Sequence, residues 1–168
     1  MKKKEILGNR GFSLVELVIV MAIMVILALT AFAGIRLLAS RPVDECAKKI
    51  QIALEGNRNT TMGKFSASLL FYMDSDGSIM VREVFNAGTP EEQLETSKIG
   101  QSGVSVKCMM KDGTEIDLST GSVIVEFNRA SGSVMNSPTG TVKSFVVSRG
   151  NRVLTVSIDT LTGRVDVQ

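Results

Sequence analysis

The chain has 168 residues, of which 44% are hydrophobic and 21% charged, and its formal net charge is +2. These values lie near globular averages, so they exclude general disorder and predict one domain with room for a separate anchoring segment. The lack of histidine excludes Ser-His-Asp, Cys-His and HExxH sites, and two cysteines are too few for a tetrahedral cysteine site for zinc.

The positive charge is concentrated at the N-terminus. Residues 1–11 hold four basic residues and one acidic residue, whereas the remaining 157 residues hold 15 basic and 16 acidic residues. A body this close to neutral argues against binding nucleic acid mainly through phosphate contacts. Residues 1–11 are therefore interpreted as a basic leader peptide.

An uncharged apolar run follows the leader, from Leu17 to Ile35. With residues 12–16 the stretch is 24 residues long, which as a helix exceeds the bilayer core of about 30 Å. A cleavable secretory signal has a shorter apolar region with a small-residue site after it, but here Gly11 comes before the run. The preceding basic residues predict a single-pass segment in the cytoplasmic membrane, with the N-terminus in the cytoplasm and the body outside.

One carboxylate interrupts the apolar character of this predicted helix. Glu16 lies near its cytoplasmic end, where an unpaired carboxylate costs about 2.5–3.5 kcal/mol on insertion scales. An ionisable residue in such a segment is a functional candidate. Candidate partners are Arg10 and the leader lysines, or the amine of Phe12 if the chain is cut between Gly11 and Phe12.

The segment from Arg10 to Glu16, Arg-Gly-Phe-Ser-Leu-Val-Glu, resembles the class III signal of type IV pilins and type II secretion pseudopilins. An ordinary signal anchor, the alternative, has no need for Gly-Phe and Glu in this register. The resemblance implies cleavage after Gly11 by prepilin peptidase, N-methylation of Phe12, and assembly of the helices into a filament core. It also implies that Glu16, at the fifth mature position, pairs with an N-terminal amine during assembly.

The helical pattern continues beyond the apolar run. Residues 12–39 are the predicted transmembrane and assembly helix, and residues 40–59 an amphipathic helix that continues into the head, with Pro42 as a candidate interruption and Gly56-Asn57 as a stop signal. The positions of its predicted buried face recur at helical spacing: Val43, Cys46, Ala47, Ile50, Ala53, Leu54 and Asn57.

Residues 60–168 form the predicted antiparallel β head domain, because the pattern there changes to strand alternation. A hairpin is predicted around Asp74-Ser75-Asp76-Gly77, and residues 87–97 are predicted to be a loop. Further strands are predicted at 104–110, 122–128, 141–149, 153–159 and 163–167. The predicted fold class is α+β: a long N-terminal helix, half transmembrane and half amphipathic, packed on antiparallel sheets, as in pilins.

Motifs in the second half of the chain resemble the H-type minor pseudopilin domain. They are Val125-Glu126-Phe127-Asn128, Ser131-Gly132, Gly140-Thr141-Val142 and Thr162-Gly163-Arg164-Val165. This resemblance implies a minor subunit, not an enzyme and without a cofactor, that primes or caps a type IV pilus, a type II secretion filament or a related filament. Its implied partners are prepilin peptidase, other pilins or pseudopilins, and the membrane. The alternative is a binding module, an adhesin or DNA receptor, displayed on the filament or anchored in the membrane.

We consider the two cysteines as a disulfide and the Asp74–Gly77 segment as a calcium site. Cys46 and Cys108 are predicted to lie outside the membrane, where they form either a disulfide or two buried free thiols. The segment Asp74-x-Asp76-Gly77 begins like a calcium loop, but position twelve is Phe85 where an EF-hand needs glutamate. We therefore predict a hairpin turn there and no metal site.

Charge in the head is uneven. Residues 74–117 carry nine acidic and four basic residues, whereas residues 141–168 carry Lys143, Arg149, Arg152 and Arg164 against two aspartates. Three interpretations follow: a solvated surface, a basic edge of one head stacked on an acidic edge of the next, or DNA capture by the C-terminal arginines. A nucleic-acid partner is the least favoured of the three.

Overall fold

The computed structural model describes residues 13–63, 66–87 and 89–168, and only the backbone of residues 31–40. The chain divides into two compact units, residues 1–39 and residues 40–168. The second of these, the head unit, contains the strands and the core. The predicted cleavage site, Gly11 and Phe12, lies outside the described residues.

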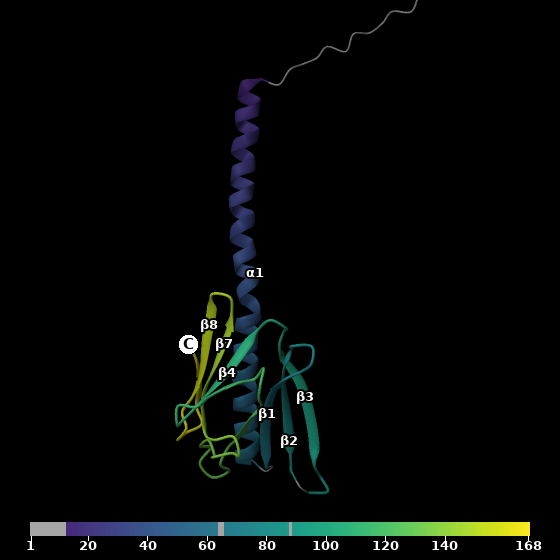
Figure 1. The fold of residues 1–168 in the computed structure, drawn as a ribbon, viewed down its shortest axis with the longest axis vertical. Helices are drawn as coiled ribbons and strands as arrows, with labels where there is room; N and C mark the ends of the chain where they lie inside the picture. Colours follow the sequence, from purple (N-terminus) through teal and green to yellow (C-terminus); the bar gives the residue numbers. More distant parts are fainter. Residues whose placement is uncertain (1–12, 64–65, 88) are drawn as a thin grey trace, which may run out of the picture. The chain divides into compact units, whose positions relative to one another are not determined.

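One long α-helix, α1 (Leu14–Gly63), includes residues of both units (Figure 1). Pro42 lies inside α1 and the helix continues past Gly56, so both the interruption predicted at the proline and the predicted stop are wrong. A glycine inside a helix costs about 1 kcal/mol and a proline about 3 kcal/mol. Both residues are next to buried positions of α1. Each large apolar side chain buried there stabilises the fold by about 1.5–3 kcal/mol, which offsets these costs.

The predicted amphipathic face of the helix is confirmed. Within the head unit, α1 buries residues one or two turns apart: Val43, Cys46, Ala47, Ile50, Leu54, Asn57 and Thr61. Ala53 packs against the same cluster while partly exposed. The spacing of three and four residues places these side chains on one side of the helix, which therefore faces the sheets.

The strands of the head unit form two antiparallel sheets. One sheet has the order β3-β2-β1-β6 and contains β1 (Ala67–Met73), β2 (Ile79–Phe85), β3 (Gln93–Gly100) and β6 (Val123–Glu126). The other has the order β5-β4-β7-β8-β9 and contains β4 (Ser105–Met110), β5 (Glu115–Asp117), β7 (Val142–Arg149), β8 (Arg152–Ile158) and β9 (Val165–Val167).

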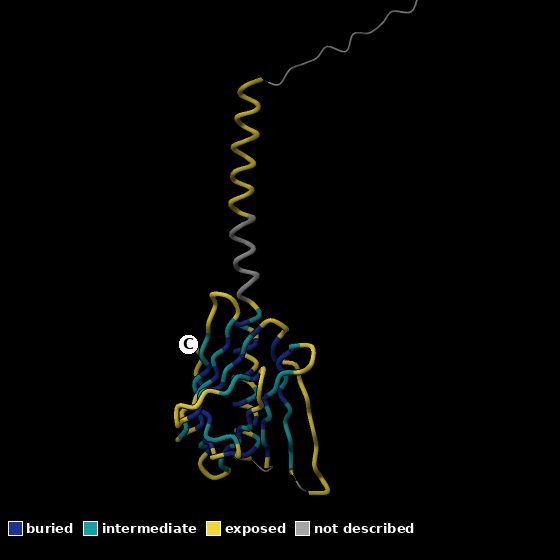
Figure 2. The backbone as a smooth tube through the Cα atoms, viewed as in Figure 1, coloured by how far each residue is buried: buried dark blue, intermediate teal, exposed yellow. Residues whose placement is uncertain are grey.

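The core of the head unit is shared by α1 and both sheets (Figure 2). Burial alternates along β1 and β4, as expected for strands with one face on the core. The rings of Phe71 in β1 and Phe145 in β7 have centroids 4.8 Å apart, so the two sheets are in contact. The α+β fold class, with an N-terminal helix packed on antiparallel sheets, is confirmed.

Two strands differ from the sequence prediction. Strand β3 begins at Gln93, inside the segment predicted as a loop, and the short strand β5 was not predicted at all. The first six residues of β3 are exposed, so no apolar alternation marks them as a strand. Backbone pairing with β2, from Phe85 opposite Gln93 to Ile79 opposite Gly100, forms this strand instead.

Both cysteines are free thiols in the core. Cys46 of α1 and Cys108 of β4 are fully buried, and no disulfide joins them. Burial raises the pKa of each thiol to about 12, although the charge of Lys49 opposes the rise at Cys46. Of the two alternatives, a disulfide or two buried free thiols, the structure shows the buried free thiols.

We expect iodoacetamide at pH 8 to modify neither cysteine in the folded chain and both in denaturant. With a thiol pKa near 12, the fraction of thiolate at pH 8 is roughly a thousandfold lower than in a free cysteine. Burial also keeps the reagent away from the sulfur atoms. Intact mass after timed alkylation, with and without reductant, measures this. A denatured chain that needs reductant before it accepts two labels would instead reveal a disulfide.

Candidate functional site

The first turn of α1 holds the one predicted N-terminal site residue that the structure describes. Glu16 lies in this turn, and Ser13 caps the helix. The Ser13 hydroxyl accepts a hydrogen bond from the Val15 backbone nitrogen at 3.3 Å, and the Ser13 carbonyl accepts one from Leu17 at 3.1 Å. Ser13 and Glu16 also have the S-x-x-E spacing of a capping box, although the hydroxyl of Ser13 bonds the nitrogen of Val15 and not that of Glu16.

The position of Glu16 suits a negative charge. The first turn of a helix has backbone N–H groups without helical partners and a partial positive charge, so a carboxylate there is stabilising. Glu16 is exposed, so its carboxylate is also accessible to a cation from outside the helix. The arrangement therefore provides an anion at the end of an apolar helix.

The helix around Glu16 presents apolar side chains on all sides. Every described side chain from Ser13 to Thr30 is exposed in the single chain (Figure 2). Thirteen of them, from Leu14 to Leu29, are large and hydrophobic, so the apolar surface is not confined to one stripe. A helix that is apolar on all sides is expected to be buried against other apolar groups, because each Å² of apolar surface left in water costs about 25 cal/mol.

Within the described ranges, no helix has both the length and the apolar character needed to cross a membrane.

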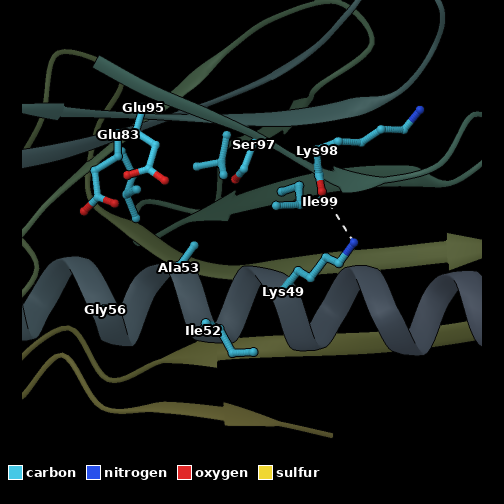
Figure 3. A pocket seen from close by; sticks show the side chains of 11 residues that line it. Lys49, Ile52, Ala53, Gly56, Glu83, Glu95, Ser97, Lys98 and Ile99 are labelled. Atoms are coloured by element: carbon cyan, nitrogen blue, oxygen red, sulfur yellow. Dashed lines mark hydrogen bonds between the residues drawn. The ribbon is translucent and has the colours of Figure 1, made fainter. Parts of the chain in front are cut away.

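A groove in the head unit runs between α1 and the β2–β3 wing, the part of the sheet formed by Ile79–Phe85 and Gln93–Gly100 (Figure 3). Its volume is about 430 Å³, and Ile52, Ala53 and Gly56 of α1 line one side. A second hollow of about 650 Å³, lined by Thr60 and Phe85 among others, shares Glu95 with it. The space above Gly56 is open, since a Cβ there would meet nothing within 4 Å.

Two carboxylates face each other across this wing. Glu83 of β2 lies directly opposite Glu95 of β3, and both line the groove. The buried Asn57 amide donates a hydrogen bond to Glu83 Oε1 at 2.8 Å. Burial raises the pKa of Glu83, the bond from Asn57 opposes the rise, and the charge of Glu95 adds to it. Like charges directly opposite each other destabilise a sheet, so this pair needs an explanation.

No sequence pattern indicates this pair, because residues 87–97 are polar and predict a loop. Glu83 and Glu95 are twelve positions apart in the sequence, and only the register of β2 on β3 makes them neighbours. No apolar alternation in β3 marks that register.

The arginines considered for DNA capture are partly engaged within the chain. Arg152 forms an ion pair with Asp44 at 2.8 Å, and Arg164 with Asp166 at 3.3 Å. Arg149, at the end of β7, is exposed, and its guanidinium would lie 3.7 Å from a Cβ placed on Gly103. The structure therefore does not collect the three charges in one free cluster.

The aspartates of the first hairpin stabilise the turn itself. Asp76 Oδ1 accepts a hydrogen bond from the Ser78 backbone nitrogen at 2.7 Å and Oδ2 one from the Ser78 hydroxyl at 2.8 Å. These bonds hold the pKa of Asp76 below its usual value. Asp74 likewise accepts a bond from the Ser75 backbone. No group of three or more His, Cys, Asp or Glu side chains is placed for a metal ion in the part of the chain that the structure describes.

Comparison with protein families gives one match. The family model of the prokaryotic N-terminal methylation motif matches residues 7–32, a segment that includes Gly11, Phe12 and Glu16. The match supports a type IV pilin-like subunit that prepilin peptidase processes and that assembles with other pilins. Pilin-like proteins with this motif are structural subunits. No curated protein and no solved structure gives a match.

Proposed function

We propose that the chain is a minor pilin or pseudopilin, a subunit of a type IV pilus or a type II secretion filament. The observation that carries this proposal is the methylation motif over residues 7–32, with Glu16 in the first turn of an exposed apolar helix. The finer assignment to the H type rests on the motifs of the second half, among them Ser131-Gly132 and Thr162-Gly163. An H-type subunit primes assembly or caps the filament tip.

Processing comes first in the proposed mechanism. Prepilin peptidase hydrolyses the peptide bond between Gly11 and Phe12, which releases residues 1–11 and leaves a new amine on Phe12. That amine is then methylated. The cut removes the basic leader, whose charge holds the N-terminus in the cytoplasm.

Storage and assembly follow from the surface of the helix. Residues 12–39 lie in the cytoplasmic membrane as a single-pass segment with the head outside, and lipid covers the apolar side chains. Assembly then moves this segment from lipid into a bundle of similar helices. An unpaired amine and an unpaired carboxylate are both costly in such an environment, so Glu16 pairs with the Phe12 amine of a neighbouring subunit.

The N-terminal mass of the protein tests this function. In membranes of cells that carry a prepilin peptidase, we expect a mature chain that begins at Phe12, with or without one methyl group. Cells without the peptidase are expected to keep residues 1–11, and so is the variant Gly11→Val, because the small residue before the cut is lost.

A chain that keeps residues 1–11 in the presence of the peptidase would contradict the proposal. The protein would then be an ordinary signal anchor, and an anchored binding module would take the place of the filament subunit.

A further inference from the structure

One polar atom in the head unit is buried without a partner. Asn57 of α1 is fully buried, and its side-chain amide nitrogen donates a hydrogen bond to Glu83 Oε1 at 2.8 Å. The oxygen of the same amide, Asn57 Oδ1, has no hydrogen-bond donor among the residues that the structure describes. Buried acceptors are costly to leave unpaired and are nearly always paired in folded proteins, so a donor is expected here.

A proton on Glu83 would supply that donor. A primary amide and a neutral carboxylic acid are complementary, because the amide N–H donates to one acid oxygen and the acid O–H donates to the amide oxygen. The bond from Asn57 to Glu83 Oε1 is the first of these two bonds. The second needs a hydrogen on Glu83 Oε2, and an ionised carboxylate has none to donate. Protonation of Glu83 therefore matches the need of Asn57 Oδ1.

Burial and a like charge favour the neutral form of Glu83. Burial is the largest influence and raises the pKa of Glu83, the bond from Asn57 opposes the rise, and the charge of Glu95 adds to it. Glu95 lies directly opposite in β3, and Figure 3 shows the two carboxylates on the same wall of the groove. Strand β1, on the other side of β2, places the uncharged Leu69 opposite Glu83. The like-charge pair is destabilising only while both glutamates are ionised.

The basic residues of the groove bond to other groups. Lys49 and Lys98 line the groove together with the two glutamates, so its formal charges balance. Lys49 Nζ nevertheless lies 3.5 Å from the Lys98 carbonyl oxygen, and Lys98 Nζ lies 3.7 Å from Asp76 Oδ2. Among the described residues, neither lysine forms an ion pair with Glu83. The balance of charge in the groove therefore does not hold Glu83 in its ionised form.

We propose that Asn57 and Glu83 form a proton-binding site, in which a proton on Glu83 Oε2 bonds to Asn57 Oδ1 and fastens the β2–β3 wing to α1. The proton comes from solvent, because Glu83 lines the groove. Below the pKa of Glu83 two hydrogen bonds join the helix to the strand, and above it one bond remains. The site is thus a clasp between α1 and the wing that tightens in acid.

The sign of the effect on stability follows from the raised pKa. Between the ordinary glutamate pKa of 4.5 and the higher pKa of folded Glu83, the folded chain holds a proton that the unfolded chain has released. Stability therefore rises as the pH falls through the folded pKa, and the gain is complete below the unfolded value. Four aspartates with lowered pKa values act in the opposite direction, but only below their ordinary value of 3.8: Asp76, Asp112, Asp117 and Asp159.

A titration followed by nuclear magnetic resonance tests the site directly. The full chain in detergent carries 13C-labelled glutamate and asparagine, and the Glu83 carboxyl signal is identified by its loss in Glu83→Gln. We expect this signal to titrate at a higher pH than that of Glu126, and the Asn57 Cγ signal to move with it, because Oδ1 gains a bond. A Glu83 pKa at or below 4.5 would overturn the inference. So would an Asn57 signal that stays constant while Glu83 titrates.

Thermal unfolding of the full chain gives a second test. Glutamine at position 83 offers Asn57 a carbonyl and an N–H at every pH, so Glu83→Gln should keep both bonds without a proton. We expect the wild-type Tm to rise on the order of 4 °C between pH 7.5 and pH 5, and Glu83→Gln to lose this rise. The control Glu126→Gln, in the edge strand β6 of the same sheet, should keep it. A wild-type rise in Glu83→Gln would contradict the proposal.

A double-mutant cycle with Asn57→Ala and Glu83→Ala distinguishes two bonds from one. If the proton closes the pair, the coupling between the two side chains should be larger at pH 5 than at pH 7.5. If Glu83 only accepts the single bond, the coupling should be larger at pH 7.5, because a bond to an ionised carboxylate is the stronger one. That second result would overturn the inference. If Asn57→Ala does not fold, the titration and Glu83→Gln decide. None of these measurements depends on cleavage at Phe12, so they leave the proposed function to its own test.

Discussion

The variant Glu16→Gln is expected to be cut and methylated at Phe12 but not to assemble into filaments. Glutamine fits the capping box with Ser13 as well as glutamate does, so the start of α1 should persist. Only the charge is lost. The Phe12 amine of a neighbouring subunit then enters the helix bundle without a counterion, at about 2.5–3.5 kcal/mol. The amount of chain in a sheared filament fraction should therefore fall on the order of a hundredfold relative to the membrane fraction.

Glu5 provides the matched control. It is also a glutamate of the N-terminal segment, but it belongs to the leader and is absent from the mature chain under the proposed cut. Glu5→Gln should process and assemble normally. Filaments of Glu16→Gln at wild-type abundance would show that assembly does not use this charge, and capping of α1 would then be the role of Glu16.

Replacing Gly163 with alanine should destabilise the head unit by about 3–5 kcal/mol. Gly163 has a φ of 67°, a left-handed conformation that costs an L-residue about 1–2 kcal/mol. A Cβ there would also collide with the Gly132 carbonyl oxygen. Moving that loop away strains the bonds from Arg58 Nε to the carbonyl oxygens of Gly132 and Thr162, at 3.3 and 3.0 Å. Hydrogen bonds to a charged group are worth about 1.5–3 kcal/mol each.

Thermal unfolding of the full chain, followed by circular dichroism, measures this effect. A loss of this size lowers Tm by roughly 10 °C in a domain of this length. Gly150→Ala is the control, because Gly150 has a φ of 57° but a Cβ would meet nothing within 4 Å. It should cost only about 1–2 kcal/mol, the left-handed conformation alone. Equal shifts for the two variants would mean that the contact between Gly163 and Gly132 does not constrain the fold.

The parts of the fold that were predictable are those with a periodic apolar signal. The buried face of α1 from Val43 to Asn57 and the hairpin of β1 and β2 follow from spacings of three to four and of two. Strand β3 was not predictable in this way, since an edge strand with exposed side chains is held by backbone bonds to its neighbour. The end of α1 was misplaced because burial of Thr61 outweighs the local cost of Gly56.

The site was predictable only where a local motif defines it. Gly11, Phe12 and Glu16 lie within one short segment, residues 11–16, so one pattern identifies all three. The pairing of Glu83 with Glu95 depends on strand register. The bond of Arg58 to Thr162 spans 104 positions. Contacts of this kind arise from the completed fold, and no single-sequence pattern encodes them.

The order in which the chain is made matters for a core built this way. The apolar face of α1 is synthesised first, whereas Phe145 and Val156, which help to cover it, belong to β7 and β8 near the end of the chain. The ion pair of Asp44 forms only after Arg152, 108 positions later in the chain, has been synthesised. Contacts between residues so far apart in the sequence slow folding, and partly folded intermediates with exposed apolar surface are prone to aggregation. The apolar face of α1 in the head unit is therefore expected to stay incompletely covered until β7 and β8 have been synthesised.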